Sequence, residues 1–336
     1  MGKTITMGDI AKKLNVSTVT VSKALRDKEG VSEEIRTKIK EAANSMGYRY
    51  NGAAKSFKDG STCNIGIIIA ERYIESGTSY YWQLYKKVTD YLMHLDYFAV
   101  FEILKLDDEQ KATIPKIIYE GKVDGIIILG QVNNDYYRLV KNLSVPIVFM
   151  DFYEKDTTQD FIVADNFYSM YLLTNYLIEM GHKDIGFIGN IKATSSIQDR
   201  FLGYIKALIE NDIDINKCMK WYIKDRKDSG EYTSFELTDT LPTAFVCNCD
   251  DIGYELINKL ERKNYNVPED ISIVGFDNIN NLTDSGVGIT TVEVDMKSMA
   301  QTAVDVLVKR INNVKIKYGI KQVTGKIVYK NSVKKI

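Results

Sequence analysis

The sequence predicts a small all-α domain followed by a larger α/β domain with parallel sheets. Three observations support this fold class. Amphipathic helical patterns fill residues 5–48, and from Ile65 onward short apolar runs alternate with segments of helical length. Charge divides in the same way: residues 1–60 carry a net charge of +5 and the rest −6, although the whole chain of 336 residues carries only −1. We therefore expect a basic head that meets a polyanion and a body with a different task.

The head is expected to contain three short helices. Thr6 and Asp9 have the spacing of a capping box at the start of the first helix. Ser17 can cap a second helix, TVTVSKAL, and Ser32 can cap a third. Two short helices joined by a tight turn indicate a helix-turn-helix, although a generic three-helix bundle with a solvated polar face gives the same pattern.

The second helix carries side chains that suit DNA reading. Thr18 and Val19 at its start, and Lys23 about one turn later, project to one side, where they can reach base edges in a major groove. Small hydroxyl groups nearby can bond phosphates. The residues expected to make these phosphate contacts are Thr6, Ser17, Thr20 and Ser22.

The apolar runs of the body are continuous rather than alternating. They fall into two sets, IGIIIA (65–70) to PIVFMDF (146–152), and FIVA (161–164) to ISIVGFDN (271–278). Continuous apolar strands separated by helices predict parallel sheets covered on both faces. Two sets predict two similar lobes, with the chain crossing between them near residue 160 and again within 290–325.

Enzymatic and membrane functions find little support. No phosphate-binding glycine loop or nucleophile elbow follows any apolar run. Two histidines and four scattered cysteines supply neither a metal site nor histidine-based catalysis. We expect no enzyme activity, no cofactor and no metal. The N-terminus has no secretory signal and no apolar stretch reaches membrane-spanning length, so the expected location is the cytoplasm.

Polar and aromatic residues at strand ends indicate a ligand site. Asp151 and Asp250 follow apolar runs, Arg200 begins a helical segment, and Tyr80-Tyr81-Trp82 follows the first run. Ligands of open α/β sheets bind beyond the carboxyl ends of the strands. Carboxylates, arginine and an aromatic face suit a polyhydroxylated ligand. Structural alternatives remain open: Asp277 can support a turn, Asp165-Asn166 can cap a helix, and Trp82 can be partly core.

These motifs carry a family resemblance over almost the whole chain. DIAKKLNVSTVTVSKAL and EAANSMGYR resemble the DNA-binding domain of the lac repressor/gal repressor family of bacterial transcription regulators. GHKDIGFIGN, RFLGYIKAL and VPEDISIVGFDN resemble that family's effector-binding and dimerising domain, which has a periplasmic-binding-protein fold with two α/β lobes. The resemblance implies a helix-turn-helix domain at 1–49, a hinge at 50–60 and an effector-binding, dimerising domain at 61–336.

The resemblance also implies roles for individual residues. It places base reading on Thr18, Val19 and Lys23, the last of which is more often arginine in the family. The implied effector contacts are Tyr81 or Trp82, Asp151, Arg200 and Asp250.

In the hinge, the resemblance implies a short helix that forms on DNA. Asn51 starts it, Ala54 packs closely, Lys55 belongs to the same segment, and Phe57 stands where a leucine usually wedges into the minor groove. The alternative is that Phe57 anchors a linker against the body.

The function implied is that of a ligand-responsive repressor. It would form a homodimer, bind a palindromic operator in double-stranded DNA, and be released by a sugar or sugar-derived inducer. One alternative is a corepressor-dependent regulator that responds to a purine or a phosphocarrier protein. A second is a solute-binding protein of transport, against which the basic head and the missing secretory signal argue.

Overall fold

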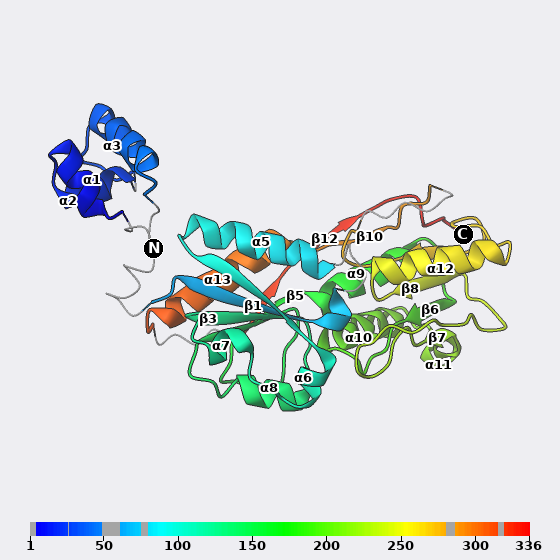
Figure 1. Ribbon diagram of the computed structural model, residues 1–336. Coiled ribbons are helices and arrows are strands. Elements are labelled where there is room, and N and C mark those ends of the chain that lie inside the picture. Colours follow the sequence, from blue (N-terminus) through cyan, green and yellow to red (C-terminus); the bar gives the residue numbers. More distant parts are fainter. Residues whose placement is uncertain (1–4, 26, 49–60, 75–79, 280–285, 315–318) are drawn as a thin grey trace. The chain divides into compact units, whose positions relative to one another are not determined.

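The computed structural model describes residues 5–25, 27–48, 61–74, 80–279, 286–314 and 319–336 (Figure 1). The chain divides into two compact units, residues 1–62 and 63–336, here called the head and the body. The hinge residues named above, Asn51, Ala54, Lys55 and Phe57, lie outside the described residues.

The described part of the head forms three helices, α1 (Met7–Leu14), α2 (Thr18–Leu25) and α3 (Glu33–Ser45). The predicted capping box is confirmed, because the Thr6 backbone N–H donates to the Asp9 carboxylate (2.8 Å) and the Asp9 N–H to Thr6 Oγ1 (3.3 Å). The buried apolar core of the described head is small and consists of Ile10, Ala11, Val21, Ala24, Ile39, Ala42 and Ala43.

Two parallel sheets organise the body. Within the described residues, the first lobe has the strand order β11-β5-β4-β3-β1-β2 and the second lobe has the order β7-β6-β8-β9. The first sheet comprises β1 (Asn64–Ala70), β2 (Phe98–Leu104), β3 (Gly125–Leu129), β4 (Ile147–Met150), β5 (Phe161–Ala164) and β11 (Ile320–Val323). The second comprises β6 (Ile185–Ile188), β7 (Tyr222–Ile223), β8 (Ala244–Cys247) and β9 (Ser272–Val274). A separate antiparallel pair joins β10 (Thr291–Glu293) and β12 (Lys326–Val328).

Helices cover both faces of the sheets, as continuous apolar strands require. In Figure 1, α5 and α13 lie on one side of the first sheet and α6, α7 and α8 on the other. The first-lobe helices are α5 (Tyr80–His94), α6 (Leu106–Gln110), α7 (Lys116–Tyr119), α8 (Asn134–Val140) and α13 (Met296–Ile311). The second-lobe helices are α9 (Asn166–Glu179), α10 (Ser195–Glu210), α11 (Ile215–Cys218) and α12 (Asp250–Arg262). Two 3₁₀ turns, η1 (Glu71–Tyr73) and η2 (Met219–Trp221), complete the described elements.

The assignment of FIVA to the second lobe is wrong. This run is β5, which pairs with β4 and with β11 in the first sheet. Its partner β11 comes from more than 150 residues further along the chain, so no local pattern reveals the pairing. The chain therefore crosses between lobes after Ala164, again between β10 and α13, and a third time between β11 and β12.

Strand β2 also differs from the expectation of burial on both faces. It lies at the edge of the first sheet, and of its seven residues the last one, Leu104, is buried. Phe98 at its start is 68% exposed. An edge strand lacks one hydrogen-bonding neighbour and is covered less completely than a central strand. No helix in the described part of the chain is long and apolar enough to cross a membrane.

Candidate functional site

Helix α2 exposes the three side chains expected to read bases. Thr18, Val19 and Lys23 are exposed, whereas Val21 and Ala24 of the same helix are buried in the head core. Val19 is 63% exposed although it is apolar. The amphipathic pattern of α2 thus places these three side chains on its exposed face.

The hydroxyl groups expected to bind phosphates have local partners. Ser17 Oγ and Thr20 Oγ1 bond each other at 2.8 Å, and the Thr20 N–H donates to Ser17 Oγ at 3.0 Å, which caps α2. The Thr6 hydroxyl donates to the Asp9 carboxylate at 2.6 Å. Thr6 could donate to a phosphate only by giving up this bond, while Ser22 is half-buried on α2.

A small pocket lies where the carboxyl ends of strands from both lobes meet. Its volume is about 60 Å³. It is lined by Tyr73, Tyr80, Tyr81 and Asp151 of the first lobe, and by Thr194, Ser196, Ile197, Arg200, Arg226, Tyr232, Asn248, Cys249, Asp251 and Asp277 of the second. This is the edge at which open α/β sheets bind ligands, so the predicted location of the site agrees with the geometry.

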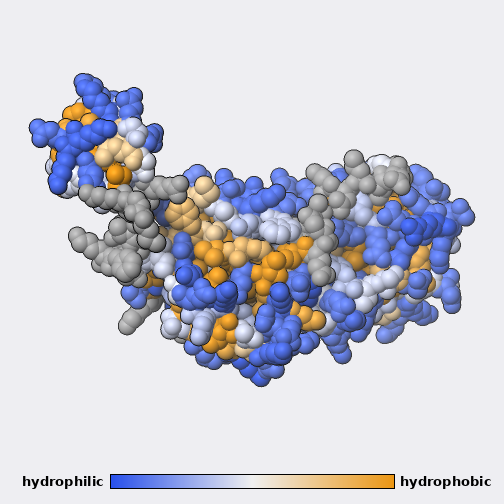
Figure 2. Space-filling view, in the orientation of Figure 1, coloured by the Kyte–Doolittle hydropathy of each residue, from blue (hydrophilic) through white to orange (hydrophobic). Residues whose placement is uncertain are grey.

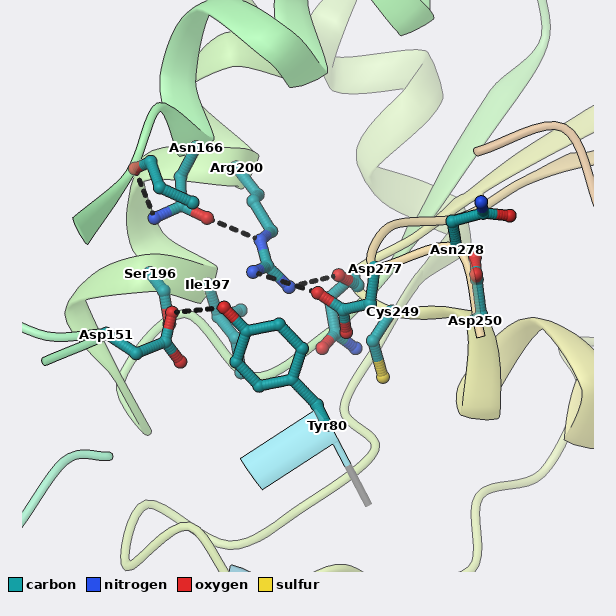
Figure 3. Close-up of polar contacts among 12 residues, drawn as sticks. Tyr80, Asp151, Asn166, Ser196, Ile197, Arg200, Cys249, Asp250, Asp277 and Asn278 are labelled. Carbon is teal, nitrogen blue, oxygen red and sulfur yellow. Dashed lines mark hydrogen bonds and ion pairs between the residues drawn. The ribbon is translucent and has the colours of Figure 1, made fainter. Parts of the chain in front are cut away.

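Arg200, one of the residues that line this pocket, is held by several polar contacts (Figure 3). Its Nε donates to Asn166 Oδ1 at 2.8 Å and its Nη1 to the Asn248 carbonyl at 2.7 Å. The guanidinium also stacks on the Phe276 ring, 3.8 Å from the ring centre. Asn166 therefore positions Arg200, whereas the preceding Asp165 caps α9 by accepting from the Tyr168 N–H.

A second arginine, Arg226, lies in the same pocket and was not predicted. Its Nε and Nη2 donate to Asp225 Oδ2 at 2.8 and 2.6 Å, and Nη2 also donates to Asn248 Oδ1 at 3.1 Å. Its guanidinium lies 4.1 Å from the centre of the Tyr232 ring. Asn248 thus links both arginines. The adjacent Asp225-Arg226 pair just after an apolar run is the one sequence signal that could have revealed it.

Asp151 and the tyrosines form the first-lobe wall. Tyr81 donates to Asp151 Oδ2 at 2.8 Å, and Tyr80 lies 3.5 Å from Asp151 Oδ1. Trp82, the alternative aromatic contact, does not line the pocket and instead packs on Tyr85 and Phe101. Because side chains on a helix turn by about 100° per residue, a shift of one position along α5 takes the aromatic ring of Trp82 away from the pocket that Tyr81 lines.

The acidic residue that lines the pocket from α12 is Asp251 rather than the predicted Asp250. Asp250 is fully buried behind it and accepts from Thr291 Oγ1 (2.7 Å) and the Ile279 N–H (2.9 Å). Asp277, expected to support a turn, also lines the pocket. Its Oδ1 is 3.6 Å from Arg200 Nη2 and has no hydrogen-bond partner among the described residues.

Burial makes these carboxylates weaker acids than usual. Removal from water raises the pKa of the Asp151, Asp250 and Asp251 carboxyls, and raises that of Asp277 to about 7. Around Asp277, the charges of Asp151 and Asp251 add to the increase, and those of Arg200 and Arg226 oppose it. Carboxylates gathered in a pocket with raised pKa values are a mark of functional sites.

This environment predicts a specific pH dependence of stability. The ordinary pKa of an aspartate is 3.8, so between about pH 4 and 7 the folded protein keeps a proton on Asp277 that the unfolded chain has released. The free energy of unfolding should therefore fall as pH rises through this window. Urea unfolding of the unsubstituted protein and Asp277→Asn, compared at about pH 5 and pH 8, checks this: the variant should lose less stability. An equal loss in both proteins would show that Asp277 does not titrate there.

Comparison with known proteins agrees with both parts of the molecule. Residues 6–51 match the group described as bacterial regulatory proteins, lacI family, and residues 174–333 match a periplasmic binding protein-like domain. The HTH-type transcriptional repressor PurR of Glaesserella parasuis is 30% identical over 311 residues, covering 91% of this chain and 90% of that protein. The HTH-type transcriptional regulator RegA of Clostridium saccharobutylicum is 31% identical over 309 residues, covering 90% and 92%.

Solved structures show the same fold. The lac repressor dimer bound to operator and the anti-inducer ONPF has a TM-score of 0.74 at 19% identity and covers 99% of this chain and 100% of that one. The transcriptional regulator CelR in complex with cellobiose has a TM-score of 0.69 at 18% identity, with 98% and 99% covered.

A helix-turn-helix head joined to a two-lobed body with a pocket between its lobes defines a ligand-responsive, DNA-binding transcriptional regulator. The relatives, which are regulators rather than enzymes or transport proteins, agree. The chain belongs to the LacI family of bacterial regulatory proteins.

Proposed function

We propose that this protein is a repressor that binds a palindromic operator as a homodimer and leaves it when a small polyhydroxylated effector binds between the lobes. The observation that carries this proposal is the pocket in which Asp151 of the first lobe faces Arg200 and Asp277 of the second. A ligand that contacts both walls favours one arrangement of the lobes over another. Such differential binding is what couples an effector to a distant DNA site.

On the DNA, α2 would lie in the major groove. Thr18 and Val19 would contact base edges. The ammonium group of Lys23 would make a single charged contact, whereas an arginine guanidinium at this position could donate two hydrogen bonds to one base. Ser17, Thr20 and Ser22 flank them and would contact phosphates, with Thr6 if its capping bond opens. A regulator with these contacts acts where bacterial DNA lies, which is the cytoplasm.

Exposed apolar side chains on the first lobe support the homodimer. They cluster on and after edge strand β2, and apolar surface is visible over this lobe in Figure 2. The residues are Phe98, Ile103, Leu106, Ile114 and Tyr119. An edge strand with exposed apolar side chains is a natural place for a second chain to pair or pack. Twofold symmetry would then require an operator with matching half-sites.

Selection of binding sites from random double-stranded DNA tests this function. The full chain should enrich one inverted repeat and bind it far more tightly than scrambled DNA of equal length. Absence of any enriched sequence would contradict the proposal, as would glycoside hydrolysis by a protein that binds no DNA.

The hinge gives a further prediction from the family resemblance. Phe57→Ala should weaken operator binding on the order of 10–100-fold, because the wedge that opens a base step is lost. Phe57→Leu, which restores the family's usual residue, should retain binding and serves as the control. Fluorescence anisotropy with the selected operator measures both. Unchanged affinity of Phe57→Ala would favour a linker anchor instead.

A further inference from the structure

We propose that Arg36 is a positioning residue for DNA recognition, because it fixes the loop against which the Lys23 side chain lies. The loop consists of residues 27–31 between α2 and α3 and is called here the α2–α3 loop. Lys23 is proposed above to read a base, so this inference rests on the proposed function and specifies what controls one of its contacts. Arg36 belongs to α3 and makes its own contacts inside the head.

The Arg36 guanidinium makes five hydrogen bonds within the head, as many as it has N–H groups. Its Nε donates to Glu33 Oε1 at 3.0 Å. The other four bonds, from Nη1 and Nη2, end on the last turn of α2 or on the α2–α3 loop. Their acceptors are the Ala24 carbonyl (3.5 Å), Asp27 Oδ1 (3.3 Å), the Lys28 carbonyl (3.0 Å) and the Val31 carbonyl (3.4 Å). Arg36 is only 9% exposed, so a phosphate could bind it only by displacing one of these acceptors.

These polar contacts, rather than apolar packing, hold the α2–α3 loop. Residues 27–30 are all exposed. Asp27 has φ 53°, a conformation that residues other than glycine rarely adopt, and its carboxylate also accepts from Lys40 Nζ at 2.6 Å. The planar guanidinium of Arg36 can donate in several directions at once, whereas the three donors of a lysine share one nitrogen. Without Arg36, the loop would lose its main attachment to α3.

The α2–α3 loop contacts Lys23 at two points. The Lys28 N–H donates to the Lys23 carbonyl at 2.9 Å. Gly30 lies beside the Lys23 side chain, because a Cβ built on Gly30 would be 3.2 Å from Lys23 Nζ. Gly30 has φ 89°, which glycine adopts without strain. The loop carbonyls that Arg36 binds precede and follow Gly30 in the chain. Arg36 therefore fixes the backbone that limits the positions open to the Lys23 ammonium group.

Such a limit matters more for a lysine than for an arginine. An ammonium group is a compact charge on a flexible stem and can reach acceptors on several bases or phosphates. Its selectivity for one base therefore depends on how narrowly the protein confines it. If the loop moves away, the charge of Lys23 still contacts DNA but discriminates less between bases. Loss of Arg36 should thus reduce discrimination at one base pair more than it reduces affinity for DNA in general.

The experiment measures base preferences of full-chain variants on the selected operator. Each base pair of the half-site is substituted in turn, and fluorescence anisotropy gives the Kd of every site and of scrambled DNA of equal length. The base pair whose preference disappears in Lys23→Ala is the one that Lys23 reads. Arg36→Met then tests the positioning role. Lys38→Met is the matched control, because it also removes one positive charge from α3 but at the surface, where Lys38 pairs with Glu34.

We expect Arg36→Met to lose on the order of 10-fold discrimination at the base pair that Lys23 reads, and Lys38→Met to keep it. Both variants should bind scrambled DNA within about twofold of each other. A merely structural role of Arg36 would lower all affinities by one factor, through the fraction of folded heads, and leave discrimination unchanged. Unchanged discrimination, or an equal loss at every base pair, would overturn the inference.

The salt dependence of binding distinguishes positioning from a phosphate contact. Each phosphate contact adds about 0.9 to the slope of log Kd against log salt concentration. Because Arg36 is buried and its donors are occupied, Arg36→Met and Lys38→Met should give the same slope. A slope lower by about 0.9 in Arg36→Met would show that Arg36 binds a phosphate, and the inference would then be wrong.

Gly30→Ala keeps the inference testable where Arg36→Met does not fold, because Gly30 is exposed in the loop. The added methyl group would displace the Lys23 ammonium and should lower discrimination at the same base pair. In a Lys23→Ala background it should cause no further loss, since residues that act through one contact are not additive. Unchanged discrimination in Gly30→Ala, or a full further loss without Lys23, would overturn the inference. Amide proton exchange reports whether each head is folded.

The unsubstituted chain separates this inference from the proposed function. If it enriches no operator, the proposed function fails before any variant is compared. If it enriches an operator and Lys23→Ala loses the preference at one base pair, the proposed reading holds whatever the other variants do. Failure of the inference then appears in Arg36→Met and Gly30→Ala alone. A Lys23→Ala chain that keeps every base preference would overturn the inference as well.

Discussion

A chain carrying Arg200→Met is expected to bind operator DNA as tightly as the unsubstituted protein and to lose its response to effector. Arg200 lies in the body, whereas the residues proposed to contact DNA lie in the head and hinge. Within the pocket, its guanidinium is fixed by Asn166 and the Asn248 carbonyl and remains close to Asp277. A preorganised charged donor of this kind contributes more to binding than a mobile one.

The expected loss is large. Hydrogen bonds to charged groups contribute about 1.5–3 kcal/mol each, so losing one of them raises the effector Kd roughly 10–100-fold. Arg138→Met is a matched control, because Arg138 is exposed and pairs with Asp135 at the surface. Calorimetric titration of both variants with a sugar that raises the melting temperature of the unsubstituted protein gives the comparison. An Arg200→Met protein that responds at ordinary effector concentrations would show that the effector binds elsewhere.

Ile39→Ala is expected to abolish operator binding by unfolding the head. The core of the described head consists of seven buried side chains. Four of them are alanines, and the other three, Ile10, Val21 and Ile39, are larger and fully buried. Truncating a buried isoleucine costs about 2–5 kcal/mol. A domain this small has only about 3–5 kcal/mol of stability to lose. The body has its own core and should still bind effector.

Ile35→Ala on the same helix is the control for this variant. Ile35 is 38% exposed, so its truncation should cost no more than about 1 kcal/mol and leave DNA binding largely intact. Operator anisotropy reports binding, and amide proton exchange of the head reports its folding. Full operator affinity in Ile39→Ala would contradict the view that this core alone holds the DNA-reading helix in place.

The parts predicted correctly from sequence are those fixed by local chemistry. The Thr6–Asp9 capping box, the exposed face of α2 and the apolar strands depend on residues within a few positions of one another. The incorrect predictions concern strands that pair although they are far apart in the sequence, or which of two adjacent residues faces the pocket. Strand β5 joins the first sheet through the distant β11, and Asp251 rather than Asp250 lines the pocket.

Nothing in the sequence-based prediction included the hydrogen-bond network around Arg226. Asp225, Arg226 and Asn248 come from loops after two different strands and meet only because β7, β6 and β8 are neighbours in the sheet. Sequence periodicity does not report which loops converge. Asp151, in contrast, could be placed because it directly follows the apolar strand β4, and Arg200 could be placed through the family resemblance, although it lies in the second turn of α10 rather than at its start.

The central claim is that one chain reads DNA and senses a small molecule, and that the two events are coupled. The most direct test is fluorescence anisotropy of the selected operator, titrated with the full chain in the presence and absence of a sugar that raises the melting temperature of the chain. A rise in operator Kd of roughly 5–150-fold with the sugar, absent in Arg200→Met, is the predicted result. An operator Kd that is unchanged by a sugar shown to occupy the pocket would contradict it.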